Sequence, residues 1–220
     1  MKKYKLKITP FLNTQLEPKD GKKYPLYYRV VYQRKSTMLK SIHNLYQAEL
    51  LHDEIIEKEI QEITGLAQYL SEVFTEPMEL TGLKSKYEQS QKKVIQILDH
   101  EIREIIGENL ANCCHPYAKG IRIGEYDEGY PIIALLEVLS LAFEENIIAE
   151  IIKHTESRIT LYHFLDNAHG SQFKEKRLVS FLNLESFDNG LIKALRKEFS
   201  AEESKELYLH LINILKHKLS

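Results

Sequence analysis

Apolar and polar residues alternate strictly at the start of the chain. Tyr4, Leu6 and Ile8 are apolar, and lysines occupy the positions before and between them. A period of two places successive side chains on opposite faces of an extended backbone. The pattern therefore predicts a half-buried strand over residues 3–9, with lysines on its exposed face.

Two further strands are predicted in the first 42 residues. The run YPLYYRVVY at 24–32 is rich in aromatic and β-branched residues, which suit the pleated surface of a sheet. Residues 37–42 form a short third strand, and polar turns at 19–22 and 33–36 separate the three. A meander of this size cannot bury both faces by itself, so another element must cover one of them.

An amphipathic helix over 45–74 is predicted to provide that cover. From Ile56 to Phe74 its apolar residues recur at intervals of three and four, the period of an α-helix. Glu76 and Pro77 end it, because the residue before a proline is disfavoured in the helical conformation.

Helical periodicity continues to the end of the chain. The expected helices are 83–110, 131–154, 157–167, 172–182, 187–199 and 201–219, and Ser200 with Glu203 predicts a capping box before the last of them. A Gly- and Pro-rich loop at 107–131 interrupts the series. The predicted fold class is α+β. A small three-stranded antiparallel sheet packs on a helix in a head of residues 1–76, and a mainly helical body of residues 77–220 follows.

Charge divides the chain in the same way. Residues 1–40 contain eleven Lys and Arg against two acids, a net charge of +9, whereas residues 41–220 carry −11. A formal net charge of −2 thus conceals a basic head joined to an acidic body. Such asymmetry indicates a polyanionic partner, most often nucleic acid or an anionic membrane.

Apolar runs and cysteines indicate the cellular compartment. No apolar run approaches the roughly 18–20 residues that cross a bilayer, and no apolar core follows the first lysines, so neither a membrane span nor a secretion signal is expected. The cysteines are the adjacent pair Cys113 and Cys114, too few for a disulfide framework. We therefore expect a cytoplasmic protein.

The segment Lys19-Asp20-Gly21-Lys22-Lys23-Tyr24-Pro25-Leu26-Tyr27-Tyr28-Arg29-Val30 resembles the arm-type DNA-binding domain at the N-terminus of tyrosine recombinases from integrative elements. The resemblance is confined to residues 1–74, and the chain lacks the catalytic domain of that family. In the family the sheet lies against the DNA groove. The resemblance therefore implies duplex DNA as partner and implies six contacting residues, which are Lys5, Lys7, Arg29, Arg34, Lys35 and Lys40.

The basic head also indicates nucleic-acid binding without the resemblance. Its cations are interleaved with tyrosines, and this combination suits contacts to phosphates and to bases. The preferred hypothesis is a non-catalytic DNA-binding accessory or regulatory protein associated with a mobile element, whose helical body contacts a protein partner. The sequence leaves open whether the polyanion is RNA, and it leaves open the oligomeric state.

Two alternatives remain. Arg158 and His163 fit the Arg-x(4–6)-His spacing of the helical HEPN ribonucleases, in which an Arg stabilises phosphate charge and a His transfers protons. The second alternative is a protein-interaction scaffold with an acidic helical body. Cys113, Cys114 and His115 resemble metal ligands, but a structural zinc site needs a second spaced pair, so no metal and no cofactor are expected.

Overall fold

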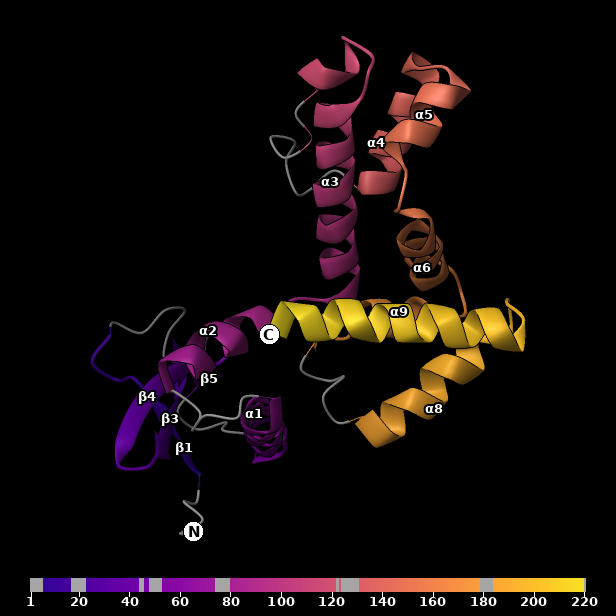
Figure 1. Ribbon diagram of the computed structural model, residues 1–220. Coiled ribbons are helices and arrows are strands. Elements are labelled where there is room, and N and C mark those ends of the chain that lie inside the picture. The colour runs from indigo at the N-terminus through magenta and orange to yellow at the C-terminus, as the bar shows by residue number, and fades with distance from the viewer. Residues whose placement is uncertain are drawn as a thin grey trace. The chain divides into compact units, whose positions relative to one another are not determined.

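The computed structural model of the 220-residue chain describes residues 6–16, 23–43, 46–47, 53–73, 80–121, 123, 131–178 and 184–219 (Figure 1). The chain forms two compact units. The first comprises Met1–Gln91 with Arg177–Glu185 and Leu219–Ser220, and the second comprises Lys92–Lys176 with Ser186–Lys218. The first unit therefore extends beyond the predicted head: it includes the helix at 80–90 and a segment near residue 180.

A three-stranded antiparallel sheet forms the centre of the first unit. Its strands are β1 (Lys7–Leu12), β3 (Leu26–Tyr32) and β4 (Lys35–Lys40), in the order β1-β3-β4. A second pairing joins the short strands β2 (Lys23–Tyr24) and β5 (Tyr46–Gln47). The central strand is the aromatic and β-branched run, and it alternates as predicted: Tyr28 and Val30 are fully buried while Arg29 between them is exposed.

Two helices complete the first unit. Helix α1 (Asp53–Val73) buries Ile56, Ile63, Leu66, Ala67 and Leu70, and α2 (Leu80–Ser90) buries Leu80, Leu83 and Tyr87. The predicted helix of 45–74 thus begins later, because β5 occupies 46–47. Helix α1 also continues through Gly65 without a break.

The second unit begins with α3 (Val94–Asn112), followed by the 3-10 turn η1 (Ala118–Gly120), α4 (Ile132–Ala142) and α5 (Glu145–Ile151). One hydrophobic cluster joins these elements. Its buried members are Ile102, Ile106, Leu110, Cys113, Ala118, Ile123, Ile132, Leu135, Leu139 and Ile151. The long helices predicted for 83–110 and 131–154 are therefore each two helices, broken at Gln91–Lys93 and at Phe143–Glu144.

The rest of the second unit contains α6 (Glu156–Asp166), α7 (Ser171–Lys174), most of α8 (Leu184–Leu195) and α9 (Ala201–Leu219). The capping box is confirmed: the Ser200 N–H donates to Glu203 Oε2 at 3.1 Å, and the Glu203 N–H donates to Ser200 Oγ at 3.3 Å. The α+β fold class is likewise confirmed. None of the described helices is both long enough and apolar enough to cross a lipid bilayer.

Candidate nucleic-acid interface

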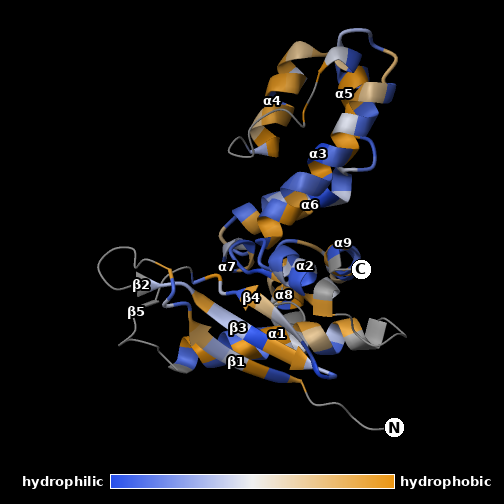
Figure 2. Cartoon of the chain, turned by 90° about the vertical axis from the view of Figure 1, so that its left-hand side faces the viewer, coloured by the Kyte–Doolittle hydropathy of each residue, from blue (hydrophilic) through white to orange (hydrophobic). Residues whose placement is uncertain are grey.

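One face of the sheet β1-β3-β4 is covered and the other is open (Figure 2). Because paired residues of neighbouring strands share a face, the register assigns nine described residues to the open face. They are Lys7, Thr9 and Phe11 on β1, Tyr27, Arg29 and Val31 on β3, and Ser36, Met38 and Lys40 on β4. None of these nine is acidic.

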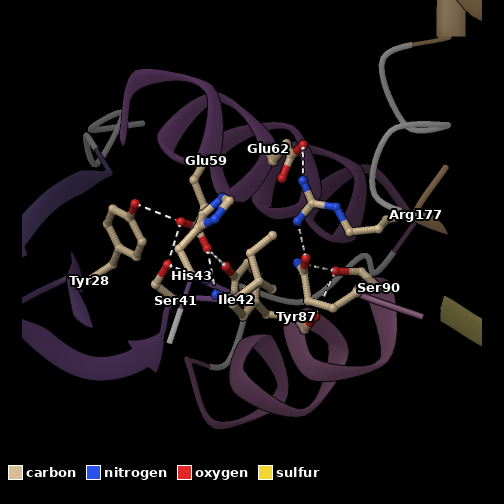
Figure 3. A network of polar contacts seen from close by, with 10 residues as sticks. Tyr28, Ser41, Ile42, His43, Glu59, Glu62, Tyr87, Ser90 and Arg177 are labelled. Carbon is tan, nitrogen blue, oxygen red and sulfur yellow. Dashed lines mark hydrogen bonds and ion pairs between the residues drawn. The ribbon is translucent and has the colours of Figure 1, made fainter. Parts of the chain in front are cut away.

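The covered face is held by a buried carboxylate (Figure 3). Glu59 of α1 is 2% exposed and accepts hydrogen bonds from the hydroxyls of Tyr28 at 2.8 Å and Ser41 at 2.7 Å, and from the Ile42 N–H at 3.0 Å. The Tyr87 hydroxyl of α2 donates to the same carboxylate. These four donors come from β3, from the segment after β4 and from α2, so Glu59 fastens α1 to the sheet and to α2.

A second buried carboxylate extends this polar network. Arg177 donates to Glu62 at 2.9 Å and to Gln91 at 2.5 Å, and the Glu62 side chain is 4% exposed. Burial raises the pKa of the Glu62 carboxyl, although the positive charge of Arg177 opposes the shift. The ion pair ties the segment after Lys176 to α1. These buried contacts lie behind the covered face and involve none of the nine residues of the open face.

The open face presents cations on a partly apolar surface. Lys7, Arg29 and Lys40 are exposed, and within the described part of the chain none of the three forms an ion pair. The rings of Phe11 and Tyr27 stack beside them, with centroids 5.9 Å apart and planes 23° apart. Because no described acid neutralises these charges, they are available to an external anion.

The hairpin between β3 and β4 adds two more cations. Gln33 and Arg34 form its two-residue turn, with φ angles of 49° and 66°. Positive φ at both central residues is typical of the primed turns of β-hairpins, whose twist matches that of the flanking strands. Neither residue is Asn or Gly, so both adopt a left-handed conformation that is costly for ordinary side chains. Arg34 and Lys35 are exposed at this tip.

The structure thus places Lys7, Arg29 and Lys40 on one face of the sheet, where Lys7 lies opposite Val31 and Lys40 opposite Tyr27. Arg34 and Lys35 lie at the end of the β3–β4 hairpin. Lys35 pairs with Tyr32, and the alternation along the strand assigns it to the covered face. It is nevertheless exposed, because it lies at the end of the strand. Lys5 and the predicted turn at 19–22 lie outside the described residues.

The sequence did not single out Phe11, Met38 or Thr9, although all three lie on the open face. Met38 is 43% exposed in the middle of β4 and pairs with Arg29. These residues are identified by the pairing register between the strands, which depends on the length and type of the hairpin turn. The sequence of one strand alone does not give this register.

Arg158 and His163 both lie on α6, but they face different directions. Five residues along a helix correspond to a rotation of about 140°. Arg158 points to α3, where its Nε lies 3.8 Å from Glu101, while His163 is exposed. The helix therefore does not bring these two side chains to one site, and the ribonuclease alternative stays a prediction.

Arg158 instead belongs to a charged cluster in the second unit. Lys218 Nζ lies 2.5 Å from Glu101 and 3.3 Å from Glu104, so α3, α6 and α9 are joined by ion pairs. His210 of α9 lies next to this cluster. Its burial, and secondarily the charge of Arg158, lower its pKa below the ordinary value of 6.5.

The cysteines lie at the end of α3. Cys113 is buried with its thiol 3.5 Å from Glu150, and Cys114 is exposed with its N–H donating to the same carboxylate at 3.3 Å. His115 packs against Phe143 with ring centroids 5.3 Å apart. In the described residues no three His, Cys, Asp or Glu side chains are grouped as a metal site requires.

Comparison of the chain with protein-family models, with curated proteins and with solved structures finds no match.

Proposed function

We propose that this protein binds duplex DNA through the open face of the sheet β1-β3-β4. The observation that carries the proposal is the composition of that face, which has three cations, a stacked aromatic pair and no acid among its described residues. Phosphate neutralisation by Lys and Arg supplies most of the affinity of such surfaces.

The arrangement of the cations suits a groove. Lys7 lies on one edge strand and Lys40 on the other, with Arg29 on the strand between them. Three strands about 4.8 Å apart give a sheet roughly 10 Å wide between its outer backbones. The major groove of B-DNA is about 12 Å wide. In this arrangement the two lysines reach the phosphates on either side, and Arg29 faces the base edges.

The biological role follows from the same arrangement. Residues 1–40 are basic and residues 41–220 are acidic. DNA attracts the basic residues and repels the acidic ones, so the charge asymmetry orients the sheet toward the DNA. The resemblance of the first 74 residues to recombinase arm-type domains supports an accessory or regulatory protein of a mobile element. In this role the protein acts without catalysing recombination.

Binding to fluorescent duplex DNA, to its separate strands and to RNA of the same sequence tests the proposal. Arg29→Glu and Lys40→Glu in the full chain should each weaken duplex binding by more than about tenfold. Lys84→Glu is the matched control, because Lys84 is an exposed lysine of α2 in the same unit and the change in charge is identical.

The proposal predicts that the control keeps the wild-type affinity and that the duplex binds better than either single strand. Duplex binding that is unchanged in both Arg29→Glu and Lys40→Glu would contradict it. Preferential binding of the single strands or of RNA would assign the face to another nucleic acid.

A further inference from the structure

Helix α4 is apolar on its outer side as well as on its buried side. Ile132, Leu135 and Leu139 are buried in the core, yet Leu141 is 89% exposed and Val138 is 50% exposed. Figure 2 shows α4 coloured as hydrophobic along most of its length. A helix that is apolar all round is normally buried on every side.

The apolar residues on the outer side of α4 form one stripe, in which Ala134 is half-buried and Val138 and Leu141 are exposed. With a rotation of about 100° per residue, Ala134, Val138 and Leu141 lie together on the side of α4 opposite to Ile132 and Leu139. Leu141 is nearly as exposed as a side chain can be, and Val138 adjoins it one turn earlier. No described element covers this outer face.

Acidic residues border the stripe. Glu137 lies one turn before Leu141, and Glu144 and Glu145 follow the end of the helix; all three are exposed. Residues 132–151 contain four acids and no Lys or Arg. The chemistry of the surface is therefore an apolar strip with a negative border.

The charge decides which occupant fits. A second copy of α4 packed across this stripe would bring Glu137 and Glu144 of both copies together, and like charges oppose such a contact. A positively charged partner segment avoids this repulsion, because its cations pair with the acidic border.

We infer that the outer face of α4 docks an amphipathic helical segment of a partner protein. The apolar side of that segment contacts Ala134, Val138 and Leu141, and its Lys or Arg residues face Glu137 and Glu144. This is packing of one amphipathic helix against the side of another, with charge specifying the partner. The surface lies in the second unit and is independent of DNA binding by the sheet.

A synthetic helical peptide provides the probe. It has 18 residues, with Leu at alternating three- and four-residue intervals and Lys elsewhere, and its binding to the full chain is measured by fluorescence anisotropy at about 0.15 M salt. Leu141→Lys and Glu137→Lys should each weaken binding about tenfold or more. Leu209→Lys controls for an exposed leucine, since Leu209 of α9 is 48% exposed, and Glu88→Lys controls for charge.

Three results would overturn the inference. The first is equal binding by the Leu141→Lys, Glu137→Lys and control variants. The second is equal binding by a peptide in which every Lys is replaced by Glu. The third is a dimer in sedimentation velocity that Leu141→Lys dissociates, which would assign the stripe to a second copy. Duplex DNA affinity, measured on the same variants, should not change with Leu141→Lys.

Discussion

The Tyr28 hydroxyl donates a 2.8 Å hydrogen bond to the buried carboxylate of Glu59. Tyr28 lies on the central strand next to Arg29, and Glu59 lies on α1. The contact therefore joins the covered face of the sheet to the helix behind it. Because neighbouring residues of a strand point to opposite faces, fixing Tyr28 inward also fixes Arg29 outward.

Replacement of Glu59 should destabilise the first unit. In Glu59→Gln the amide NH2 faces hydroxyl donors in a buried site, and we expect a loss of about 3 kcal/mol in the free energy of unfolding. Tyr28→Phe should cost about 1–2 kcal/mol, because it removes a single donor. Urea unfolding measures both losses.

The control for these variants is Glu57→Gln, because Glu57 is an exposed carboxylate two residues earlier on the same helix. Its stability should remain within about 0.5 kcal/mol of the wild type. A Glu59→Gln variant as stable as Glu57→Gln would show that the hydrogen bonds to Glu59 do not hold the sheet.

The sheet was predictable because alternation of apolar and polar residues follows directly from the geometry of a strand. Strict alternation assigned Lys7 outward and the aromatic strand inward at every second residue, and the structure has this parity. The third strand was predicted at residue 37 but begins at Lys35, since Gln33 and Arg34 make a two-residue turn without the Asn or Gly that normally marks one.

The breaks in the long helices and the buried acids were not predictable in the same way. The break at residues 91–93 leaves Lys93 extended, with a ψ of 149°, and the Lys93 N–H donates to Gln96 Oε1 at 3.1 Å at the start of α3. Apolar spacing alone does not show such a local contact. Glu59 and Glu62 lie on the inner side of α1 and are read as solvent-facing by polarity alone. Their burial depends on donors from β3, α2 and the segment at Arg177, all distant in sequence.

Arg177 and Glu62 should be energetically coupled. Arg177→Met leaves the buried Glu62 carboxylate without its cation, and we expect a loss of about 3 kcal/mol in stability. In the double variant with Glu62→Gln the loss should be smaller than the sum of the single losses, because no uncompensated charge remains. Urea unfolding of the four proteins gives the coupling energy.

The pH dependence of Arg177→Met gives a second check on this pair. The pKa of Glu62 is already raised by burial, and removal of Arg177 raises it further. The folded state then binds more protons than the unfolded state, so the variant should gain stability as pH falls from neutral toward the ordinary pKa of 4.5, relative to wild type. A parallel pH profile in both proteins would contradict a charged Glu62–Arg177 pair.

His210 should make the second unit sensitive to acid. Its pKa in the folded protein lies below 6.5, mainly because of burial and also because Arg158 is near, whereas Glu101 acts in the opposite direction. The unfolded chain then binds more protons, so stability is complete above pH 6.5 and falls as pH decreases through the folded pKa. His210→Gln should flatten this dependence in urea unfolding between pH 7.5 and 5.5, values taken as about one unit either side of the ordinary pKa.

The control for His210 is His169→Gln, because His169 is exposed. This variant should keep the wild-type slope of stability against pH. Equal slopes in His210→Gln and wild type would show that the burial of His210 does not contribute to acid sensitivity.

Substitutions in the turn at Gln33 and Arg34 should distinguish effects on stability from effects on DNA binding. Both residues have positive φ, so Gln33→Asn with Arg34→Gly should increase the free energy of unfolding by about 1 kcal/mol. The same change removes an exposed cation at the hairpin tip and should weaken duplex binding severalfold. Gln33→Asn alone should increase stability and leave DNA affinity unchanged, which distinguishes the backbone effect from the loss of charge.

The salt dependence of duplex binding should identify which cations contact phosphate. The logarithm of the association constant falls with the logarithm of salt concentration by about 0.9 for each neutralised phosphate of B-DNA. Lys7→Gln and Lys40→Gln should therefore each reduce the slope by about 0.9, since both lysines lie on the outer strands of the open face. Lys84→Gln, on α2, should leave the slope unchanged.

Arg29 should behave differently from the two lysines. It lies on the central strand, where a groove-bound sheet faces base edges, and Arg pairs with the acceptors of guanine in a bidentate manner. Arg29→Gln should therefore reduce the difference in affinity between a preferred duplex, selected from a random pool, and an unrelated duplex. If instead it reduces both affinities equally and lowers the salt slope as the lysines do, Arg29 contacts phosphate and the sheet does not lie in the groove in the proposed orientation.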